Sequence, residues 1–532
     1  MSQEHARHPD TERDHHPDAE HAAVVIVGAG PVGVVAATLL SQRGIDSVVL
    51  EHHTAPYPLP RAVHLDDEVY CILRELGVDD RFAAISRPMP GMRLVDAGHR
   101  TMAEFRRDAV TGPMGCPQAS MFDQPDLEQL LLDNLAAHSR VVLRRGATVT
   151  SIESLPGSAV VRYADTTGEH CILADAVLGC DGANSVVRDA IGASMLDLRF
   201  RERWLVIDVR TSAPLLVWGG VHQICDPHRP ATFMHVTGTR YRWEFRLADG
   251  EEAADLTAPE VLAGLLEPWF GPSLPADVEI IRHATYTFRA QVADRWRSGR
   301  VFLLGDAAHQ TPPFIGQGLG AGLRDAHNLA WKLAGVLHGQ LGENVLETYE
   351  AERRPHATRT VRAAVAVGWA LTGGQDRAAL LRKNVLAVLC RVPGLSRAVL
   401  SSASPALGHS ALVTGNLVTG RLAHRQPGRV FPAVLAAASP SRGFTIVSNH
   451  TPKPAEARAL RTLGVGHSVG RGRGGAALIR PDGAVAAVEY GRSAVTRLLA
   501  LVQSVSTSTV AGAAGSVSAG PARLTSIRET HS

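Results

Sequence analysis

Between residues 22 and 51 the hydrophobic positions form three short runs separated by small or polar residues. The run 23–27 (AVVIV) is β-branched and has no polar position, which is typical of a parallel strand buried on both faces. The run 33–43 predicts a helix, which Gly44 would end. The run 46–50 predicts a second strand. We therefore expect this segment to fold as a βαβ unit.

The same segment resembles a membrane span in one respect, since residues 22–40 carry no charge over a length that would cross a bilayer. Its middle, however, holds the pattern Gly28-x-Gly30-x-x-Gly33. Between a strand and a helix, this pattern suits a dinucleotide pyrophosphate. Gly28 permits a tight turn, Gly30 lets the phosphates approach the backbone, and Gly33 lets the helix pack on the sheet. The helix N-terminus favours phosphate charge, and Glu51 is placed to accept hydrogen bonds from an adenosine ribose. A dinucleotide site is predicted, and a membrane helix is not.

Two later segments also combine an apolar run, a turn and a helix. Residues 176–180 predict a buried strand that ends at the turn Asp181-Gly182, just before a helix start. Residues 300–304 predict another buried strand. It is followed by Gly305-Asp306, a Pro- and Gly-rich loop, and a long helix over 322–338.

A different pattern marks the region 195–296, which we expect to form a second sheet. Residues 240–247 alternate charged and apolar side chains, as in a half-buried antiparallel strand. Tyr241, Trp243 and Phe245 are expected to face the interior, and Arg240, Arg242 and Arg246 the opposite face.

The C-terminal third predicts smaller elements joined by Gly- and Pro-rich links. We expect a strand over 444–447, a helix over 456–463, a hairpin over 476–488 and a closing helix over 492–501.

Composition and charge exclude several classes of protein. With 45% hydrophobic and 20% charged residues, the chain suits a folded protein with a large core. Lys plus Arg (54) nearly balances Asp plus Glu (52), so no strong field would steer nucleic acid or an anionic membrane. The six cysteines include no C-x-x-C pair, which favours a reducing, cytoplasmic setting and no disulfide scaffold or zinc cluster. The His-rich segment 1–21 lacks the apolar core of a signal peptide. We expect a disordered tail there, with metal binding by its histidines as the alternative.

Taken together, the three motifs resemble those of the single-component FAD-dependent aromatic hydroxylases, the family of p-hydroxybenzoate hydroxylase. That family carries a dinucleotide fingerprint, a DG motif and a GD motif in this order, here at 28–33, 181–182 and 305–306. The resemblance implies FAD as cofactor, NADH or NADPH as co-substrate with O2, and a small phenolic substrate. It implies no nucleic acid and no membrane partner, and a homodimer is one possible assembly.

The resemblance also implies roles for individual residues. Asp306 would hydrogen-bond the ribityl chain of FAD. Asp181 would support the pyrophosphate region and, through Arg188, the transient binding of NAD(P)H. Pro312 and Pro313 would wall one face of the flavin ring. The remaining implied cofactor residues are Arg61 at the pyrophosphate, Gln124 near the flavin, and Gly316, Gly318 and Gly320, whose backbone N–H groups would approach the N1–C2=O edge.

Two local expectations accompany these assignments. Pro60-Arg61-Ala62 is expected to open a helix that runs to about Leu76, and Asp123 to serve as the N-cap of the helix after it. For Arg61 and Gln124 the alternative is an ordinary solvated position.

Within the family, the chain is most similar to the 3-(3-hydroxyphenyl)propionate/3-hydroxycinnamate hydroxylases over residues 22–370. The implied reaction adds a hydroxyl ortho to a phenol hydroxyl, giving a 2,3-dihydroxy product in aromatic catabolism. His64 stands where that subfamily usually has glycine. No catalytic residue that activates the phenol can be assigned. A propionate carboxylate would want a basic partner; our hypothesis is an arginine of strand 240–247, and the alternative is a solvated charged face.

The expected fold is α/β: a Rossmann-like FAD-binding domain, a mixed β-sheet substrate domain, and a C-terminal thioredoxin-like domain that lacks redox cysteines. The predicted divisions are a tail over 1–21, the FAD-binding domain over 22–195 and 297–370, the substrate sheet over 196–296, the C-terminal domain over 371–503, and a disordered tail over 504–532.

Several other functions share part of this pattern. A biosynthetic hydroxylase of a larger polyketide-type phenol would carry the same cofactor motifs, and a non-catalytic flavin-binding protein would lack only turnover. A flavin halogenase is disfavoured because no two tryptophans lie two residues apart. Residues 466–470 match the serine-hydrolase pattern G-x-S-x-G, but the predicted context is not strand–turn–helix. Residues 470–475 repeat G-x-G-x-x-G without a following helix, so we interpret them as an Arg/Gly loop.

Overall fold

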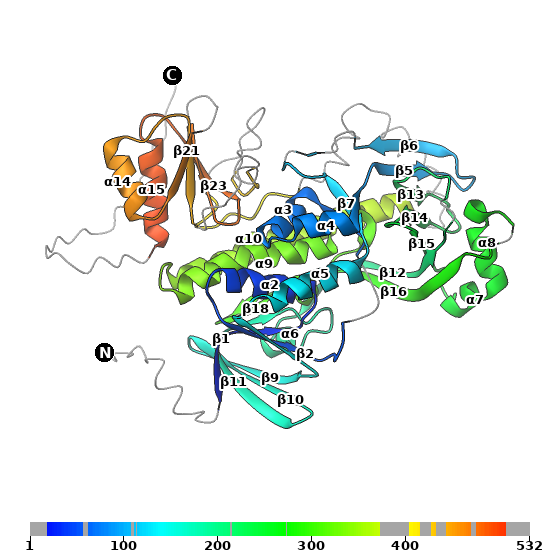
Figure 1. Ribbon diagram of the computed structural model, residues 1–532, viewed down its shortest axis with the longest axis horizontal. Coiled ribbons are helices and arrows are strands. Elements are labelled where there is room, and N and C mark those ends of the chain that lie inside the picture. The colour runs from blue at the N-terminus through cyan, green and yellow to red at the C-terminus, as the bar shows by residue number, and fades with distance from the viewer. Residues whose placement is uncertain are drawn as a thin grey trace, which may run out of the picture.

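The computed structural model describes residues 19–56, 62–107, 111–112, 114–212, 215–272, 274–372, 404–414, 427–431, 443–469 and 475–506. Arg61 and positions 470–474 of the Arg/Gly segment lie outside these ranges. Figure 1 shows a sheet at the bottom of the molecule, a second sheet at the right, two long helices across the middle and a smaller sheet at the upper left.

The lower sheet begins with the predicted βαβ unit. Strand β1 (Glu20–Val27) pairs in parallel with β2 (Ser47–Glu51), and α2 (Pro31–Gln42) connects them. The helix begins two residues before the predicted start because Pro31 occupies the first turn, where its missing N–H costs nothing. The order β17-β18-β11-β1-β2-β8 completes the main path, and β9 and β10 extend it beside β11. The other strands are β8 (Val141–Arg145), β9 (Thr148–Leu155), β10 (Ser158–Asp165), β11 (Gly168–Gly179), β17 (Arg297–Ser298) and β18 (Val301–Leu303).

This sheet is assembled from two distant parts of the chain. After β11 ends at Gly179, the chain passes through the short helix α6 (Val186–Ala190) into the second sheet. It returns only at β18, which pairs in parallel with β11 through Val177 and Val301. The turns after β1, β11 and β18 therefore meet at one edge of the sheet, which is where ligands bind in open α/β sheets.

The second sheet has the strand order β19-β16-β12-β15-β14-β13-β5-β6. Its inner face is aromatic: Tyr241, Trp243 and Phe245 are buried, as their alternation predicted. Helices α7 (Ala253–Thr257) and α8 (Pro259–Phe270) contribute Leu256 and Leu266 to the same cluster. The strands are β5 (Gly91–Val95), β6 (Thr101–Arg106), β12 (Met195–Arg210), β13 (Val221–Ile224), β14 (Ala231–His235), β15 (Arg240–Arg246), β16 (Glu279–Ala293) and β19 (His309–Gln310).

The opposite face of β15 is not the solvated face that we considered. Arg242 is only 1% exposed, and its Nε donates to Oδ1 of Asp208 at 2.7 Å. Arg282 of β16 donates through Nε to the other oxygen of Asp208 at 2.6 Å. The Asp208 carboxylate on β12 thus lies between one arginine of β15 and one of β16. Its negative charge permits the burial of Arg242.

Strands β3, β7 and β4 form a three-stranded sheet. Two predictions for the segments near it, the helix start at Ala62 and the helix cap at Asp123, were wrong. The helix expected from Ala62 starts later, because His64–Asp66 forms β3 and Asp66 accepts a hydrogen bond from the Val69 N–H as the N-cap of α3. Asp123 does occupy the N-cap position of α5, but its side chain does not cap the helix; its carboxylate pairs with Arg240. The elements are α3 (Asp67–Glu75), α4 (Asp79–Ile85), β4 (Ser86–Pro88), β7 (Ala119–Phe122) and α5 (Gln124–Ala136).

The two long helices are α9 (Gly318–Leu337), which starts four residues before the prediction, and α10 (Glu347–Thr372). Trp331 of α9 packs edge-on against Phe444 with ring centroids 5.7 Å apart, so the C-terminal unit rests on this helix. The 3-10 turns η1 (Gly305–Ala307) and η2 (Pro313–Ile315) precede α9, and η3 (Glu343–Leu346) joins it to α10.

In the C-terminal unit the described residues form the sheet β21-β20-β22-β23 with two helices. The predicted strand, helix, hairpin and closing helix are all present. Residues Gly466–Val469 form a strand, which is not the context of a hydrolase nucleophile. The elements are β20 (Thr445–Ser448), α14 (Pro454–Thr462), β21 (Gly466–Val469), β22 (Gly475–Ile479), β23 (Val485–Tyr490) and α15 (Ala494–Val505).

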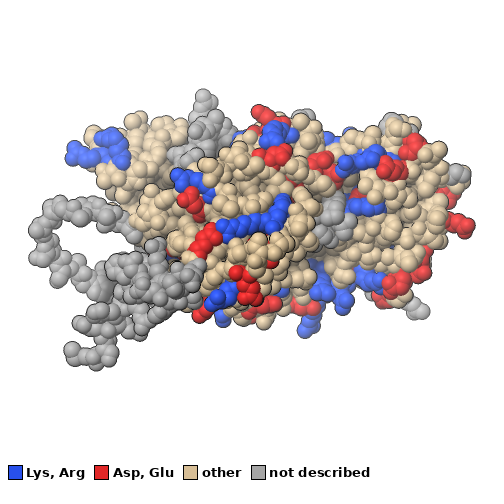
Figure 2. Space-filling view, turned by 60° about the horizontal axis from the view of Figure 1, so that its bottom comes forward, with Lys and Arg blue, Asp and Glu red and all other residues tan. Residues whose placement is uncertain are grey.

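The molecular surface shown in Figure 2 carries acidic and basic side chains interspersed, with no broad patch of one sign on that face. This agrees with the near-neutral net charge of the sequence. In the described residues, no helix combines the length and the apolar character that a membrane crossing requires.

Candidate active site

The turn between β1 and α2 forms a cradle of glycines. Gly28 has φ +100°, a conformation that side-chain-bearing residues rarely adopt. A Cβ on Gly33 would lie 2.0 Å from the Gly28 carbonyl oxygen, so only glycine permits this contact of turn and helix. Gly30, the N-cap of α2, has no atom within 4 Å of the position a Cβ would take. The space beside Gly30 and the helix N-terminus suits a pyrophosphate.

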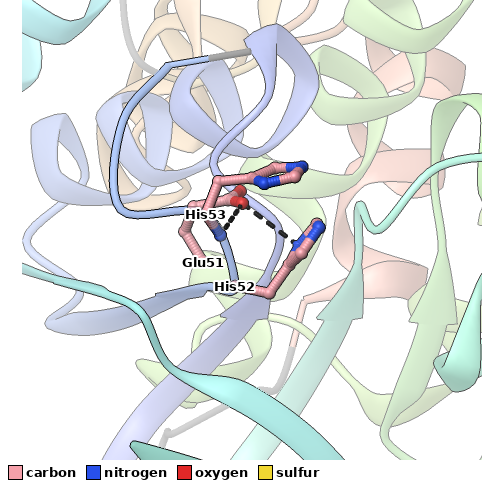
Figure 3. Close-up of side chains that lie close together, drawn as sticks. All are labelled: Glu51, His52 and His53. Atoms are coloured by element: carbon pink, nitrogen blue, oxygen red, sulfur yellow. Dashed lines mark hydrogen bonds and ion pairs between the residues drawn. The ribbon is translucent and has the colours of Figure 1, made fainter. Parts of the chain in front are cut away.

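Glu51 closes one side of this cradle at the end of β2. Its carboxylate accepts hydrogen bonds from the backbone N–H groups of Ala29 and His53, each at 2.8 Å. Figure 3 shows the Glu51 side chain beside the two imidazoles, with Nδ1 of His52 3.2 Å from Oε1. A carboxylate has about four lone-pair positions, so acceptor capacity remains for ribose hydroxyls. Glu51 therefore fixes the glycine turn, and its remaining acceptor capacity agrees with the ribose contact that we expect.

The trio Glu51, His52 and His53 also has its ligand atoms within 4.8 Å of one another, the spacing of a metal site. Both histidines are exposed, and the trio lies where the ribose is expected. We interpret it as part of the dinucleotide site.

Asp181, the acid of the DG motif, folds its own turn. It accepts from the Ser185 hydroxyl at 2.6 Å and from the Val187 N–H at 3.1 Å, and burial raises the pKa of its carboxyl group. The guanidinium of Arg188 donates to the backbone carbonyls of Ala183 and Ala307. Arg188 thus joins the DG turn to the GD motif.

The GD motif is held by a residue that the sequence analysis did not assign. Asp325 of α9 is fully buried and accepts from the Gly305 N–H at 3.0 Å, from His309 at 2.7 Å and from Arg353 at 2.8 Å. Although burial raises its pKa, the charges of Arg353 and His309 hold it below the ordinary value. A sequence signal was available, because Asp325 lies on the apolar face of the helix, one turn from Ala321 and Leu329.

The loop from Thr311 to Gly320 forms the remaining wall. Gly316 has φ +62°, and a Cβ there would lie 2.7 Å from Nδ1 of His64. A Cβ on Gly320 would lie 3.0 Å from Nη1 of Arg324, so this glycine also fills a tight position. Gly318 is the first residue of α9, whose N-terminal N–H groups favour an anionic group. Pro313 begins the 3-10 turn beside it.

Gln124 ties the start of α5 to the chain before β3. Its Oε1 accepts from the Ala62 N–H at 2.6 Å, and its Nε2 donates to Glu128 at 2.6 Å. The position is therefore structured and not simply solvated. Arg61, the residue before Ala62, lies outside the described residues.

An FAD fits these surroundings. Glycines line the turn after β1, a carboxylate ends β2, and the Gly-rich loop leads into the N-terminus of α9. Two buried polar atoms in the loop region, Nε2 of His64 and Oγ1 of Thr311, have no hydrogen-bond partner among the described residues. The arrangement defines a flavin-binding oxidoreductase site.

Comparison with known proteins identifies the family. Residues 21–364 match the family model "FAD binding domain". The chain is 36% identical over 403 residues to 3-(3-hydroxy-phenyl)propionate/3-hydroxycinnamic acid hydroxylase 2 of Burkholderia vietnamiensis (strain G4 / LMG 22486), covering 74% of this chain and 72% of that protein. It is 37% identical over 347 residues to a probable NADH-specific resorcinol 4-hydroxylase of Rhodococcus jostii (strain RHA1), covering 65% and 64%. This chain belongs to the FAD-dependent aromatic hydroxylases, as its motifs predicted, and its cofactor is FAD.

Solved structures share the fold over more of the chain. Aklavinone-11 hydroxylase, solved with FAD and aklavinone, aligns with a TM-score of 0.73 at 24% identity, covering 91% of this chain and 98% of that one. The rebeccamycin biosynthetic enzyme RebC with reduced flavin aligns with a TM-score of 0.73 at 21% identity, covering 91% and 99%. At these identities the likeness concerns the fold alone.

Proposed function

We propose that this hydroxylase acts on a small phenol at the ring position ortho to the hydroxyl, with 3-(3-hydroxyphenyl)propionate and 3-hydroxycinnamate as its first substrates. The observation that carries the proposal is the 36% identity over 403 residues to a hydroxylase of that name. We place the enzyme in the catabolism of aromatic compounds in the cytoplasm.

The proposed FAD contacts are the residues that the motifs of the sequence indicate. Gly28, Gly30 and Gly33 cradle the pyrophosphate with Arg61, and Glu51 accepts from the ribose. Asp181 and Asp306 stand at the pyrophosphate and ribityl chain. Pro313, Gln124, Gly316, Gly318 and Gly320 surround the flavin. The bound flavin supplies the redox and oxygen chemistry, while the protein orients the ring of the phenol and excludes water.

A second candidate is a phenol without a carboxylate, such as resorcinol or a larger polyketide-type phenol. The arginines of β15, which we considered as carboxylate partners, already have acidic partners. Arg240 pairs with Asp123, Arg242 with Asp208, and Arg246 with Glu202 at 3.5 Å. None of the three offers an unpaired charge to a substrate, so β15 gives no support for recognition of a propionate carboxylate, and the uncharged phenol stays the second candidate.

The direct experiment measures NADH and NADPH consumption by the FAD-loaded enzyme with 3-(3-hydroxyphenyl)propionate, resorcinol or no phenol, together with product analysis. The matched control is 3-phenylpropionate, which lacks only the hydroxyl. Strong stimulation with a 2,3-dihydroxy product supports the first candidate. Stimulation by resorcinol alone supports the second, and stimulation by 3-phenylpropionate would contradict both.

For the C-terminal unit we propose a thioredoxin-like domain without redox function. Its support is a mixed sheet with helices α14 and α15 and a sequence without a C-x-x-C pair. Equal activity with and without a dithiol reductant would agree with this assignment.

A further inference from the structure

The side chain of His64 lies against the loop that borders the flavin position. Nδ1 of His64 is 3.3 Å from the carbonyl oxygen of Gly316, and a Cβ on Gly316 would come within 2.7 Å of the same nitrogen. The two residues are 252 positions apart in the chain, so the contact is made only by the folded protein. His64 is therefore a wall residue of the proposed active site.

This contact fixes the state of the imidazole. A carbonyl oxygen can only accept a hydrogen bond, so Nδ1 carries the proton and Nε2 keeps its lone pair. Burial lowers the pKa of His64 to about 4, and the positive charges of Arg107 and Arg324 act in the same direction against the charge of Asp66. The ring is neutral at neutral pH, and Nε2 is a hydrogen-bond acceptor.

The acceptor atom Nε2 receives no hydrogen bond from the described residues. Nε2 of His64 is shielded from solvent, and no described residue donates to it. An unpaired buried polar atom costs about 1–3 kcal/mol, so native structures rarely keep one without a reason. The second unpaired atom of this region, Oγ1 of Thr311, belongs to the same loop as Gly316.

The strand that carries His64 also adjoins the second sheet. Strand β3 pairs His64 with Met121 of β7, and Met121 belongs to a buried cluster with Met234 of β14, a strand of the second sheet. His64 thus lies on a strand whose neighbour β7 packs on the second sheet, while its imidazole contacts the loop at Gly316. A phenol bound between these two walls brings a hydroxyl hydrogen, which is the kind of donor that Nε2 lacks.

We propose that Nε2 of His64 accepts a hydrogen bond from the hydroxyl of the phenolic substrate and thereby selects phenols with a free hydroxyl and sets the orientation of the ring. This inference rests on the proposed function. Because Nε2 is far less basic than a phenolate, His64 orients the hydroxyl and does not remove its proton.

The test compares the Kd of 3-(3-hydroxyphenyl)propionate with that of its methyl ether, followed by flavin absorbance in the FAD-loaded enzyme without NADH. The wild type is expected to prefer the phenol about 10-fold, the value of one buried hydrogen bond. His64→Gly should lose most of this preference. His64→Gln keeps an acceptor oxygen and should retain part of it. The control His467→Gln replaces an imidazole that binds Ser448 in the C-terminal unit, and it should behave like the wild type.

FAD content and Tm are recorded for each variant. An unchanged preference in a folded, FAD-loaded His64→Gly enzyme would overturn the proposal. So would weaker FAD binding with the phenol preference intact, since Nε2 would then serve the flavin N3–H. If the wild type binds neither ligand, the proposed substrate fails, and the role of His64 is decided by the same comparison between resorcinol and 3-methoxyphenol.

Discussion

Nζ of Lys332 lies 2.7 Å from Oε2 of Glu352, and neither side chain is exposed to solvent. Lys332 is on α9 and Glu352 on α10, and Arg480 of the C-terminal unit contacts the other oxygen of Glu352 at 2.8 Å. Asp482 pairs with Arg480, so two positive and two negative charges balance inside the protein. These ion pairs thus hold the C-terminal unit against α9 and α10.

Removal of one charge from this cluster should destabilise the enzyme strongly. Glu352→Gln leaves Lys332 and Arg480 with too little negative charge in a buried position, and we expect a loss of about 3–5 kcal/mol in the free energy of unfolding. Thermal unfolding of the FAD-loaded protein, followed by flavin fluorescence, measures it. The control Asp133→Asn breaks the half-exposed pair with Arg81 and should cost under about 1 kcal/mol. Equal effects of the two variants would contradict the cluster's role.

Gly30→Ala should weaken FAD binding without destabilising the fold. No protein atom would touch the new methyl group, and the backbone of Gly30 (φ −67°) accommodates alanine. Apo-protein stability is therefore expected to change by less than about 1 kcal/mol, since the loss of a glycine N-cap offsets the gain from a stiffer unfolded chain. FAD affinity should fall at least about 10-fold, since the methyl group would meet the pyrophosphate.

Titration of the apo-protein with FAD, followed by quenching of flavin fluorescence, gives this affinity. Gly264→Ala is the matched control, because that glycine also has open space but lies in α8. Unchanged FAD affinity in Gly30→Ala would contradict the proposed position of the pyrophosphate beside Gly30.

Glu51→Gln should weaken FAD binding through two losses. The amide keeps one acceptor oxygen, so one of the two backbone donors, Ala29 or His53, loses its charged partner, as does the ribose. Hydrogen bonds to charged groups contribute about 1.5–3 kcal/mol, which corresponds to roughly 10- to 150-fold in Kd. Equilibrium titration with FAD checks this. Glu153→Gln, on exposed β9, should bind FAD like the wild type.

Acid should lower the free energy of unfolding by protonating Glu75, which joins three helices. This carboxylate of α3 binds Arg43, the C-cap residue of α2, at 2.7 Å and His327 of α9 at 2.7 Å. Burial opposes ionisation, but the charges of His327 and Arg43 lower the pKa of Glu75 to about 2. Because the folded-state pKa lies below the ordinary 4.5, its stabilisation is present above pH 4.5 and is lost between pH 4.5 and 2.

The size of this effect is at most about 3 kcal/mol. Urea unfolding at pH 7 and at pH 3 measures it in the wild type and in Glu75→Gln. The variant should be less stable at pH 7 and closer to the wild type at pH 3. A constant difference between the two proteins at both pH values would contradict the lowered pKa.

The elements that the sequence predicted well are those with a local signature. The strand 23–27, the glycine turn and the following helix appear where expected because burial on both faces, Gly28 and Gly33 leave their pattern within a few residues. The short strand β3 was missed because its partner β7 lies more than 50 residues away. In the same way, no local pattern connects Asp123 to Arg240 or His64 to Gly316. The cofactor motifs were readable, whereas the pairings that distinguish the substrate side depend on tertiary contacts.

The late position of β18 in the chain affects folding during synthesis on the ribosome. About 120 residues separate Gly179, the end of β11, from Val301, the start of β18. At 5–20 residues per second, synthesis of this interval takes roughly 6–24 s. During that time the terminal residues of β11 present an unpaired strand edge, which invites association with other chains. Nascent chains that stop before Val301 should therefore depend on chaperones, and the cofactor can first be captured only after the second sheet has been made.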